Sequence, residues 1–176
     1  MWNIEPIEAK HFEGTLRVIN ALYREEPFFL QCDKLSLKEL SDWLTLHQSC
    51  GYPLFVAVEG GEVIGWSFAY GIADTSRAHC ACLWIGISAN RRGAGLGRAL
   101  LETTLDQAWK VGLWRVELEV YPDNVRAINL YRSVGFAEES MKPMAHLING
   151  TPLDLIGMGI LSPVARKKIR PEQQAA

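Results

Sequence analysis

The chain has 176 residues, of which 48% are hydrophobic and 22% charged, and its formal net charge at pH 7 is −2. This composition is typical of one soluble globular domain and argues against a nucleic-acid partner, because proteins that bind phosphate backbones concentrate Lys and Arg on one surface. No stretch reaches the roughly 18 apolar residues of a membrane span and the N-terminus lacks the order of a signal peptide, so we expect a cytoplasmic protein without membrane contacts.

The first half of the chain predicts a strand, two helices and a hairpin. The second helix has the clearest start, because Ser36 is followed three residues later by Glu39, as in a capping box. Gly60 and Gly61 predict the hairpin turn. The predicted elements are a strand at 2–7, helices at 16–23 and 36–47, and strands at 53–58 and 63–70.

The second half alternates strands and helices and ends in a hairpin. Gly112 and Gly135 fit the ends of two helices, and Asn149-Gly150 is a strong signal for a hairpin turn. The predicted elements are strands at 79–87 and 114–121, helices at 96–110 and 126–134, and strands at 145–148 and 153–160.

These elements predict an α+β fold with one mixed sheet of about seven strands, flanked by about four helices. With no internal repeat and no long linker, we expect a single domain over residues 1–161. The basic segment after it, within residues 162–176, is expected to be a flexible C-terminal tail.

The segment Arg92-Gly93-Ala94-Gly95-Leu96-Gly97 lies between a predicted strand and a predicted helix. Glycines there let backbone N–H groups converge on one point, and the helix N-terminus adds partial positive charge, which together favour a phosphate. Arg91, Arg92 and Arg98 would add cationic donors. The absence of a Lys-Ser or Lys-Thr pair excludes a nucleoside-triphosphate loop, whereas a dinucleotide site stays open because Glu117 or Glu119 could act as its ribose-binding acid.

A second segment, Asn124-Val125-Arg126-Ala127-Ile128-Asn129-Leu130-Tyr131 ahead of Gly135-Phe136, decides between these alternatives. Together, Arg-x-x-Gly-x-Gly and Asn-x-x-Ala-x-x-Leu-Tyr make residues 53–160 resemble the GCN5-related N-acetyltransferase (GNAT) family. The motif around Glu119 is most similar to that of the bacterial enzymes that acetylate the N-terminal alanine of a ribosomal protein. The resemblance implies acetyl-CoA as co-substrate, no metal, and a sheet whose two central strands splay apart.

The resemblance also implies which residues hold the coenzyme. The strand before the glycine loop would bind the pantetheine arm and the acetyl carbonyl through its main chain, and the loop would bind the pyrophosphate. Asn124 would cap the following helix and contact the coenzyme arm. The implied coenzyme-binding residues are Ile85, Gly86, Ile87, Arg92, Gly93, Ala94, Gly95, Leu96, Gly97, Arg98, Asn124 and Tyr131.

Two catalytic residues follow from the resemblance. Tyr131 occupies the position of the general acid that protonates the departing thiolate; its alternative role is packing. Many members carry a glutamate just ahead of the position of Leu83, where this chain has Cys82, which is a poor base at neutral pH. Glu119 is therefore the predicted general base, acting through water, and its alternative is a surface carboxylate paired with Lys or Arg.

The predicted function is transfer of the acetyl group of acetyl-CoA to a primary amine, either a peptide N-terminus or a small molecule. The alternative is a catalytically silent acyl-CoA-binding regulatory domain. Acceptor selection is expected from the loop at 25–33, the turn at 74–77 and the last hairpin. The cysteines show no metal-binding spacing, and a homodimer is compatible with the sequence.

Overall fold

The structure, a computed structural model, describes residues 1–25, 35–71, 74–148 and 150–168. Its strands are β1 (Asn3–Pro6), β2 (Leu54–Glu59), β3 (Glu62–Gly71), β4 (Cys80–Ile87), β5 (Arg115–Val120), β6 (Ala137–Ile148) and β7 (Thr151–Leu161). Its helices are α1 (Phe12–Glu25), α2 (Leu37–Ser49), α3 (Leu96–Lys110), α4 (Val125–Val134) and α5 (Pro163–Lys168). Single 3-10 turns lie at η1 (Ala9–His11), η2 (Thr75–Arg77) and η3 (Ala89–Arg91).

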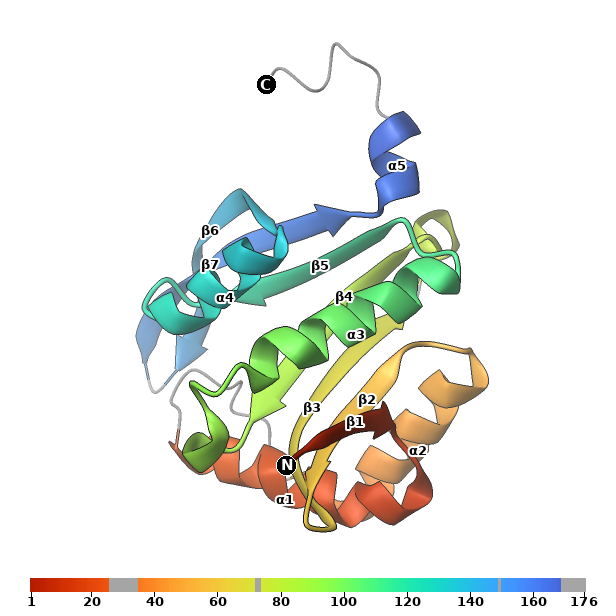
Figure 1. Cartoon of the computed structure of the whole chain (residues 1–176). Coiled ribbons are helices and arrows are strands. Elements are labelled where there is room, and N and C mark those ends of the chain that lie inside the picture. The colour runs from red at the N-terminus through yellow and green to blue at the C-terminus, as the bar shows by residue number, and fades with distance from the viewer. Residues whose placement is uncertain (26–34, 72–73, 149, 169–176) are drawn as a thin grey trace.

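One seven-stranded sheet with the order β1-β2-β3-β4-β5-β7-β6 forms the centre of the molecule (Figure 1). Its neighbouring strands are antiparallel except for β4 and β5, which run parallel. The α+β fold class with a mixed sheet of about seven strands is confirmed.

The parallel pair at the centre of the sheet is short. The pairing of β4 with β5 ends at Cys82 opposite Glu117, although β4 continues to Ile87 and β5 to Val120. Over the same stretch β4 stays paired with β3, and β5 stays paired with β7. The two central strands therefore part, as predicted, and leave main-chain groups of β4 that β5 does not pair.

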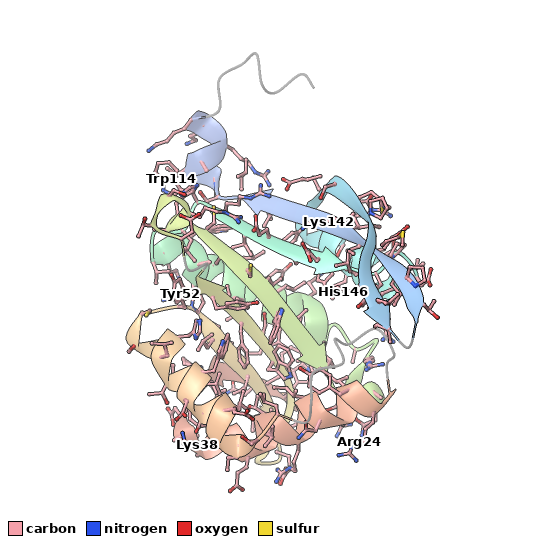
Figure 2. The ribbon with its side chains drawn as sticks, turned by 180° about the vertical axis from the view of Figure 1, so that it is seen from behind. Arg24, Lys38, Tyr52, Trp114, Lys142 and His146 are labelled. Carbon is pink, nitrogen blue, oxygen red and sulfur yellow. The ribbon has the colours of Figure 1, made fainter. Side chains whose placement is uncertain are left out.

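Helices cover both faces of the sheet, because side chains along a strand alternate between faces. Phe68 packs in a core with Leu22 of α1 and Leu44 of α2, whereas its neighbour Ala69 packs in a core with Leu101 of α3. Helix α3 lies in front of the sheet in Figure 1, and α1 and α2 lie in front of it in the reverse view of Figure 2. The predicted capping box starts α2: Glu39 N donates to Ser36 Oγ at 3.2 Å.

The last hairpin is longer than the sequence predicts. Strand β6 begins at Ala137 instead of residue 145, and almost all of its side chains are exposed. Strand β6 lies at the edge of the sheet and has bulges between residues 138 and 140 and between 142 and 146. Its sequence therefore lacks the alternation of apolar and polar residues by which a strand is predicted, so residues 137–144 were missed. In the second bulge Met144 has φ +52° and its N–H donates to Asp154 Oδ1 at 2.8 Å.

The predicted flexible tail needs a correction, because residues 163–168 form the short helix α5. Its start is fixed by Ser162, whose Oγ accepts a hydrogen bond from Ala165 N at 3.1 Å. Lys168 lies over the ring of Trp114 at 3.9 Å from its centroid. The remainder of the tail, the acidic residues Glu26 and Asp33 of the predicted acceptor loop, and Asn149 of the hairpin turn lie outside the described residues.

Candidate functional site

A cavity of about 890 Å³ lies where β4 and β5 part. Four of the predicted site residues line it, namely Ile85, Glu119, Asn124 and Tyr131. They come from β4, β5 and the start and middle of α4, so the parting of the strands brings together groups that are far apart in the sequence. The remainder of the wall comes from further residues of β4 and β5, from α1, α2, β3, η2, β6 and β7, and from Leu35 and Tyr121.

The glycine loop lies between β4 and α3, outside the cavity wall. Gly93 and Gly95 have φ +83° and +80°, a left-handed conformation that favours glycine, and a Cβ built on either would meet nothing within 4 Å. Gly95 directly precedes α3, whose first N–H groups have no partner within the helix. The loop and helix N-terminus therefore combine an open backbone with free N–H groups, features that favour a phosphate.

Two glycines of the predicted set have a packing role that the sequence did not reveal. A Cβ on Gly97 would lie 2.9 Å from Leu130 Cδ2 and 3.1 Å from Ile87 Cδ1, where α3 meets α4 and β4. A Cβ on Gly86 would lie 2.6 Å from Leu22 Cδ1 and 2.8 Å from the indole ring of Trp66. Both positions need glycine because neighbouring elements approach closely, whether or not a ligand is bound.

The arginines around the loop already have acceptors within the protein. Arg91 pairs with Glu59 at 2.6 Å, Arg98 pairs with Glu102 at 3.1 Å, and Arg92 donates from Nε to the carbonyl of Ile87 at 3.0 Å. Both guanidinium groups are exposed, and ion pairs at the protein surface contribute only about 0–1 kcal/mol. Either guanidinium can thus turn to an incoming anion at small cost.

Tyr131 reaches the cavity from α4, which Asn124 starts by accepting a hydrogen bond from Ala127 N at 3.1 Å. Its ring packs against Phe136 with centroids 5.9 Å apart. Burial raises the pKa of Tyr131 to about 12, so the phenol keeps its proton at neutral and moderately alkaline pH. The side chain therefore packs against the core and also presents a protonated group to the cavity.

Glu119 forms an ion pair with Lys142 of β6. The side chains are 44% and 53% exposed, so this pair has the form of the surface alternative considered for Glu119. Both residues nevertheless line the cavity, and the carboxylate raises the pKa of Lys142, which keeps the ammonium charged at neutral pH. Figure 2 labels Lys142 and His146, which both belong to β6 and both line the cavity.

The structure adds a charged network that sequence reasoning missed. Glu117 accepts from Arg77 of η2 and from Arg115 Nε at 3.0 Å, and Arg115 also binds Glu139 of β6. Burial alone would raise the pKa of Glu117, but the hydrogen bonds from Arg115 and Arg77 hold it below its usual value. Arg115 and Glu117 are two residues apart on a strand, a spacing that placed them on one face and could have predicted their contact.

The protonation state of Cys82, which also lines the cavity, matters for the choice of base. Burial raises the pKa of Cys82, so its thiol is mostly protonated at neutral pH and is unsuited to accept a proton. Tyr121 and His146 contact each other, with the hydroxyl 2.6 Å from Nδ1. This pair could not be predicted from a local pattern, because the two residues are 25 positions apart in the chain.

Within residues 1–25, 35–71, 74–148 and 150–168, no group of three or more His, Cys, Asp and Glu side chains is arranged to hold a metal ion. In the same part of the chain, no helix is long and apolar enough to cross a membrane.

Comparison with known proteins gives concordant matches. An L-methionine sulfoximine/L-methionine sulfone acetyltransferase of Salmonella typhimurium is 29% identical over 126 residues, covering 66% of this chain and 68% of that protein. A ribosomal protein bS18-alanine N-acetyltransferase of Escherichia coli is 41% identical over 58 residues, 33% of this chain and 39% of that protein. The solved structure of yncA from Salmonella typhimurium with its cofactor acetyl-CoA has a TM-score of 0.86 at 21% identity, covering 91% of this chain and 93% of that one.

The family model named "Acetyltransferase (GNAT) family" matches residues 16–136, a span that includes β4, the glycine loop and the helix bearing Tyr131. The order of motifs, the parting of the two central strands and this match agree. The chain therefore belongs to the GNAT family of acetyltransferases.

Proposed function

We propose that this protein transfers the acetyl group of acetyl-CoA to a primary amine, a small molecule or a peptide N-terminus, by direct attack of the amine on the thioester. The observation that carries the proposal is the cavity at the parting of β4 and β5, which Ile85, Glu119 and Tyr131 line together. Membership of an acetyltransferase family supports it, as do relatives that acetylate amines of both kinds.

The residues present fit the coenzyme. The open space above Gly93 and Gly95, together with the N-terminus of α3, suits the pyrophosphate, and the main chain of β4 beyond Cys82 is available to the pantetheine arm. The coenzyme supplies the acetyl thioester. Held along β4, the thioester carbonyl would lie beside Ile85, within the cavity that Tyr131 and Glu119 also reach.

In the proposed reaction the amine nitrogen forms a bond to the acetyl carbon, and main-chain N–H groups of β4 stabilise the charge on the carbonyl oxygen. Glu119 accepts a proton from the amine through a water molecule. As the carbon–sulfur bond breaks, Tyr131 donates its proton to the thiolate and then regains one from solvent. The pKa of about 12 suits Tyr131 to this role, because the group must arrive protonated.

The rival function is binding of acyl-CoA without transfer, for which the glycine loop and β4 would suffice. Placement of both Tyr131 and Glu119 on the cavity favours the enzyme. Thiol release from acetyl-CoA, measured against amino acids, polyamines, aminoglycosides and N-terminal peptides, separates the two. We expect at least one amine to give acceptor-dependent release; tight acetyl-CoA binding with no release against any amine would favour the silent domain.

Replacing Gly95 by Val should weaken acetyl-CoA binding sharply while the protein stays folded. The added side chain projects into the open space of the loop, and the left-handed φ costs the fold only about 1–2 kcal/mol. Calorimetric titration with acetyl-CoA measures the effect. Gly61→Val is the matched control, because Gly61 has φ +84° and equally open surroundings in the β2–β3 turn.

Gly97 is a poorer position for this test. A Cβ there presses on Leu130 and Ile87, so Gly97→Ala should lower the free energy of unfolding by about 1–3 kcal/mol through overpacking. Unchanged acetyl-CoA affinity in a folded Gly95→Val protein would reject the loop as the pyrophosphate site.

A further inference from the structure

Three aromatic side chains from different elements form one wall of the cavity. Trp43 of α2 stacks on Trp84 of β4, with ring centroids 6.2 Å apart and planes inclined by 17°. Tyr70 of β3 meets both edge-on, at 5.1 Å from Trp43 and 5.5 Å from Trp84. We call these three residues the aromatic wall; all of them line the cavity.

Two further aromatic side chains, which are buried and also line the cavity, pack against the aromatic wall. Trp66 and Phe68 of β3 stack at 4.8 Å, and both are almost fully buried. Trp66 lies 6.5 Å from Trp84, and Phe68 lies 6.0 Å from Trp43. These contacts leave little freedom for Trp43 and Trp84, so a ligand could bind them without ordering new side chains.

Part of this aromatic surface is left open. Trp84 is 39% exposed, and Trp43 and Tyr70 are only partly buried. Large aromatic side chains gain most from removal of apolar surface from water, so rings held open toward a cavity favour an apolar occupant. Ile19, Leu35 and Leu40 continue the same apolar lining on the helical side of the cavity.

The wall is close to the proposed transfer site. Trp84 directly precedes Ile85, and it lies on β4 just beyond Cys82, the last residue of β4 that pairs with β5. The side chains of Trp84 and Ile85 point to opposite faces of the sheet, but both line the cavity along the edge of β4 that β5 leaves unpaired. An acceptor bound at that edge can therefore extend its side chain to the face that carries Trp84.

We propose that the amine acceptor carries a large apolar or aromatic side chain next to its amino group, and that this side chain binds against Trp43, Tyr70 and Trp84. The inference rests on the proposed function and specifies its acceptor. An amino group next to a large apolar side chain occurs both in a free amino acid and in the first residue of a peptide.

A cationic side chain is the main competitor, because aromatic faces also attract ammonium groups and Glu39 lines the cavity. Glu39, however, is committed to the start of α2, where Glu39 Oε2 accepts from Ser36 N at 2.8 Å and from Ser36 Oγ at 2.6 Å. The other carboxylates that line the cavity are paired as well, Glu117 with Arg77 and Arg115, Glu139 with Arg115, and Glu119 with Lys142. Next to Glu39 the lining residues Leu35 and Leu40 are apolar, which favours the apolar side chain.

The first experiment compares kcat/KM for L-Ala, L-Leu, L-Phe and L-Lys, both as free amino acids and as the first residue of otherwise identical tripeptides. We expect kcat/KM to rise by about tenfold or more from Ala to Phe, since each methylene buried in an apolar pocket is worth about tenfold or more. Comparison of the two series identifies the source of the acceptor. No dependence on side-chain size, or a preference for L-Lys, would overturn the proposal.

The second experiment tests the wall itself. Trp84→Ala should raise KM for the Phe acceptor by about tenfold or more, leave KM for acetyl-CoA and for the Ala acceptor within about twofold, and be largely rescued by Trp84→Phe. Trp114→Ala is the matched control, because Trp114 is also 39% exposed but lies outside the cavity wall, against His79 and Lys168. An equal loss for both acceptors would assign Trp84 a structural role and reject the proposal.

A calorimetric titration separates this inference from the proposed function. L-Phe amide and L-Ala amide are added to the wild type and to Trp84→Ala, each saturated with CoA. If the wild type binds the Phe amide more tightly than the Ala amide and Trp84→Ala abolishes this difference in affinity, the aromatic wall is supported even if no amine is acetylated. Equal binding of both amides to the wild type would reject the wall even if acetylation were observed.

Discussion

Replacing Tyr131 by Phe is expected to lower kcat by about 10²–10⁴, the usual contribution of a general acid or base, and to leave acetyl-CoA binding intact. The substitution removes only the hydroxyl, so the ring still packs against Phe136. Because burial raises the pKa of Tyr131 to about 12, the wild type should show no loss of activity from ionisation of this group until the pH approaches that value. Steady-state kinetics with a saturating amine, paired with calorimetry for acetyl-CoA, provides the measurement.

Tyr52→Phe is the control for this substitution. Tyr52 and Tyr131 both pack, partly buried, against the same core, but Tyr52 is not part of the cavity wall. Loss of its hydroxyl should therefore leave kcat unchanged. Full activity in Tyr131→Phe would return Tyr131 to the packing role that its contacts also allow.

Local patterns predicted most of the fold. The Ser36–Glu39 capping box and the glycines at 93, 95 and 135 can be predicted from a few neighbouring residues. Each depends only on the local backbone, as a helix start or as a left-handed φ. The parting of β4 and β5 came from the family resemblance and is confirmed by their pairing. The length of β6 was missed because its exposed, bulged sequence shows no period of two.

The site was harder to predict, because its contacts join distant segments. The partner of Glu119 lies 23 residues away on an unpredicted part of β6. The aromatic wall combines Trp43, Tyr70 and Trp84, and each of these reads in sequence as an ordinary apolar position of a helix or strand. Only the position of α2 against the sheet shows that these rings meet at a cavity.

Glu119 forms an ion pair with Lys142 in the structure and is also the proposed general base. An ion pair with Lys142 is compatible with catalysis, because a carboxylate has two oxygens and the pair is solvent-exposed. In the proposed reaction Glu119, which lines the cavity, accepts the proton of the amine through water. Only a kinetic comparison separates a base from a partner of Lys142.

Glu119→Gln is expected to lower kcat at neutral pH by about 10²–10⁴ and to leave a smaller deficit at high pH. An amine acceptor is mostly protonated at neutral pH, so without a base the reaction depends on the rare neutral form, whose population rises with pH toward the pKa of the amine. The pH profiles of kcat for wild type and variant, measured with one amine, provide the comparison.

Two further variants make the result specific to the carboxylate. Lys142→Met removes the ion pair but keeps Glu119, so it should retain most of the activity if the carboxylate acts as base and lose it if the pair itself is what matters. Cys82→Ala should have little effect beyond a packing cost of about 1 kcal/mol, because burial keeps the Cys82 thiol protonated. A folded Cys82→Ala protein without turnover, combined with an active Glu119→Gln protein, would place the base on β4 instead of β5. The pH profile then decides the matter, because loss of a base has its largest effect where the amine is most protonated, whereas loss of packing lowers the rate at every pH.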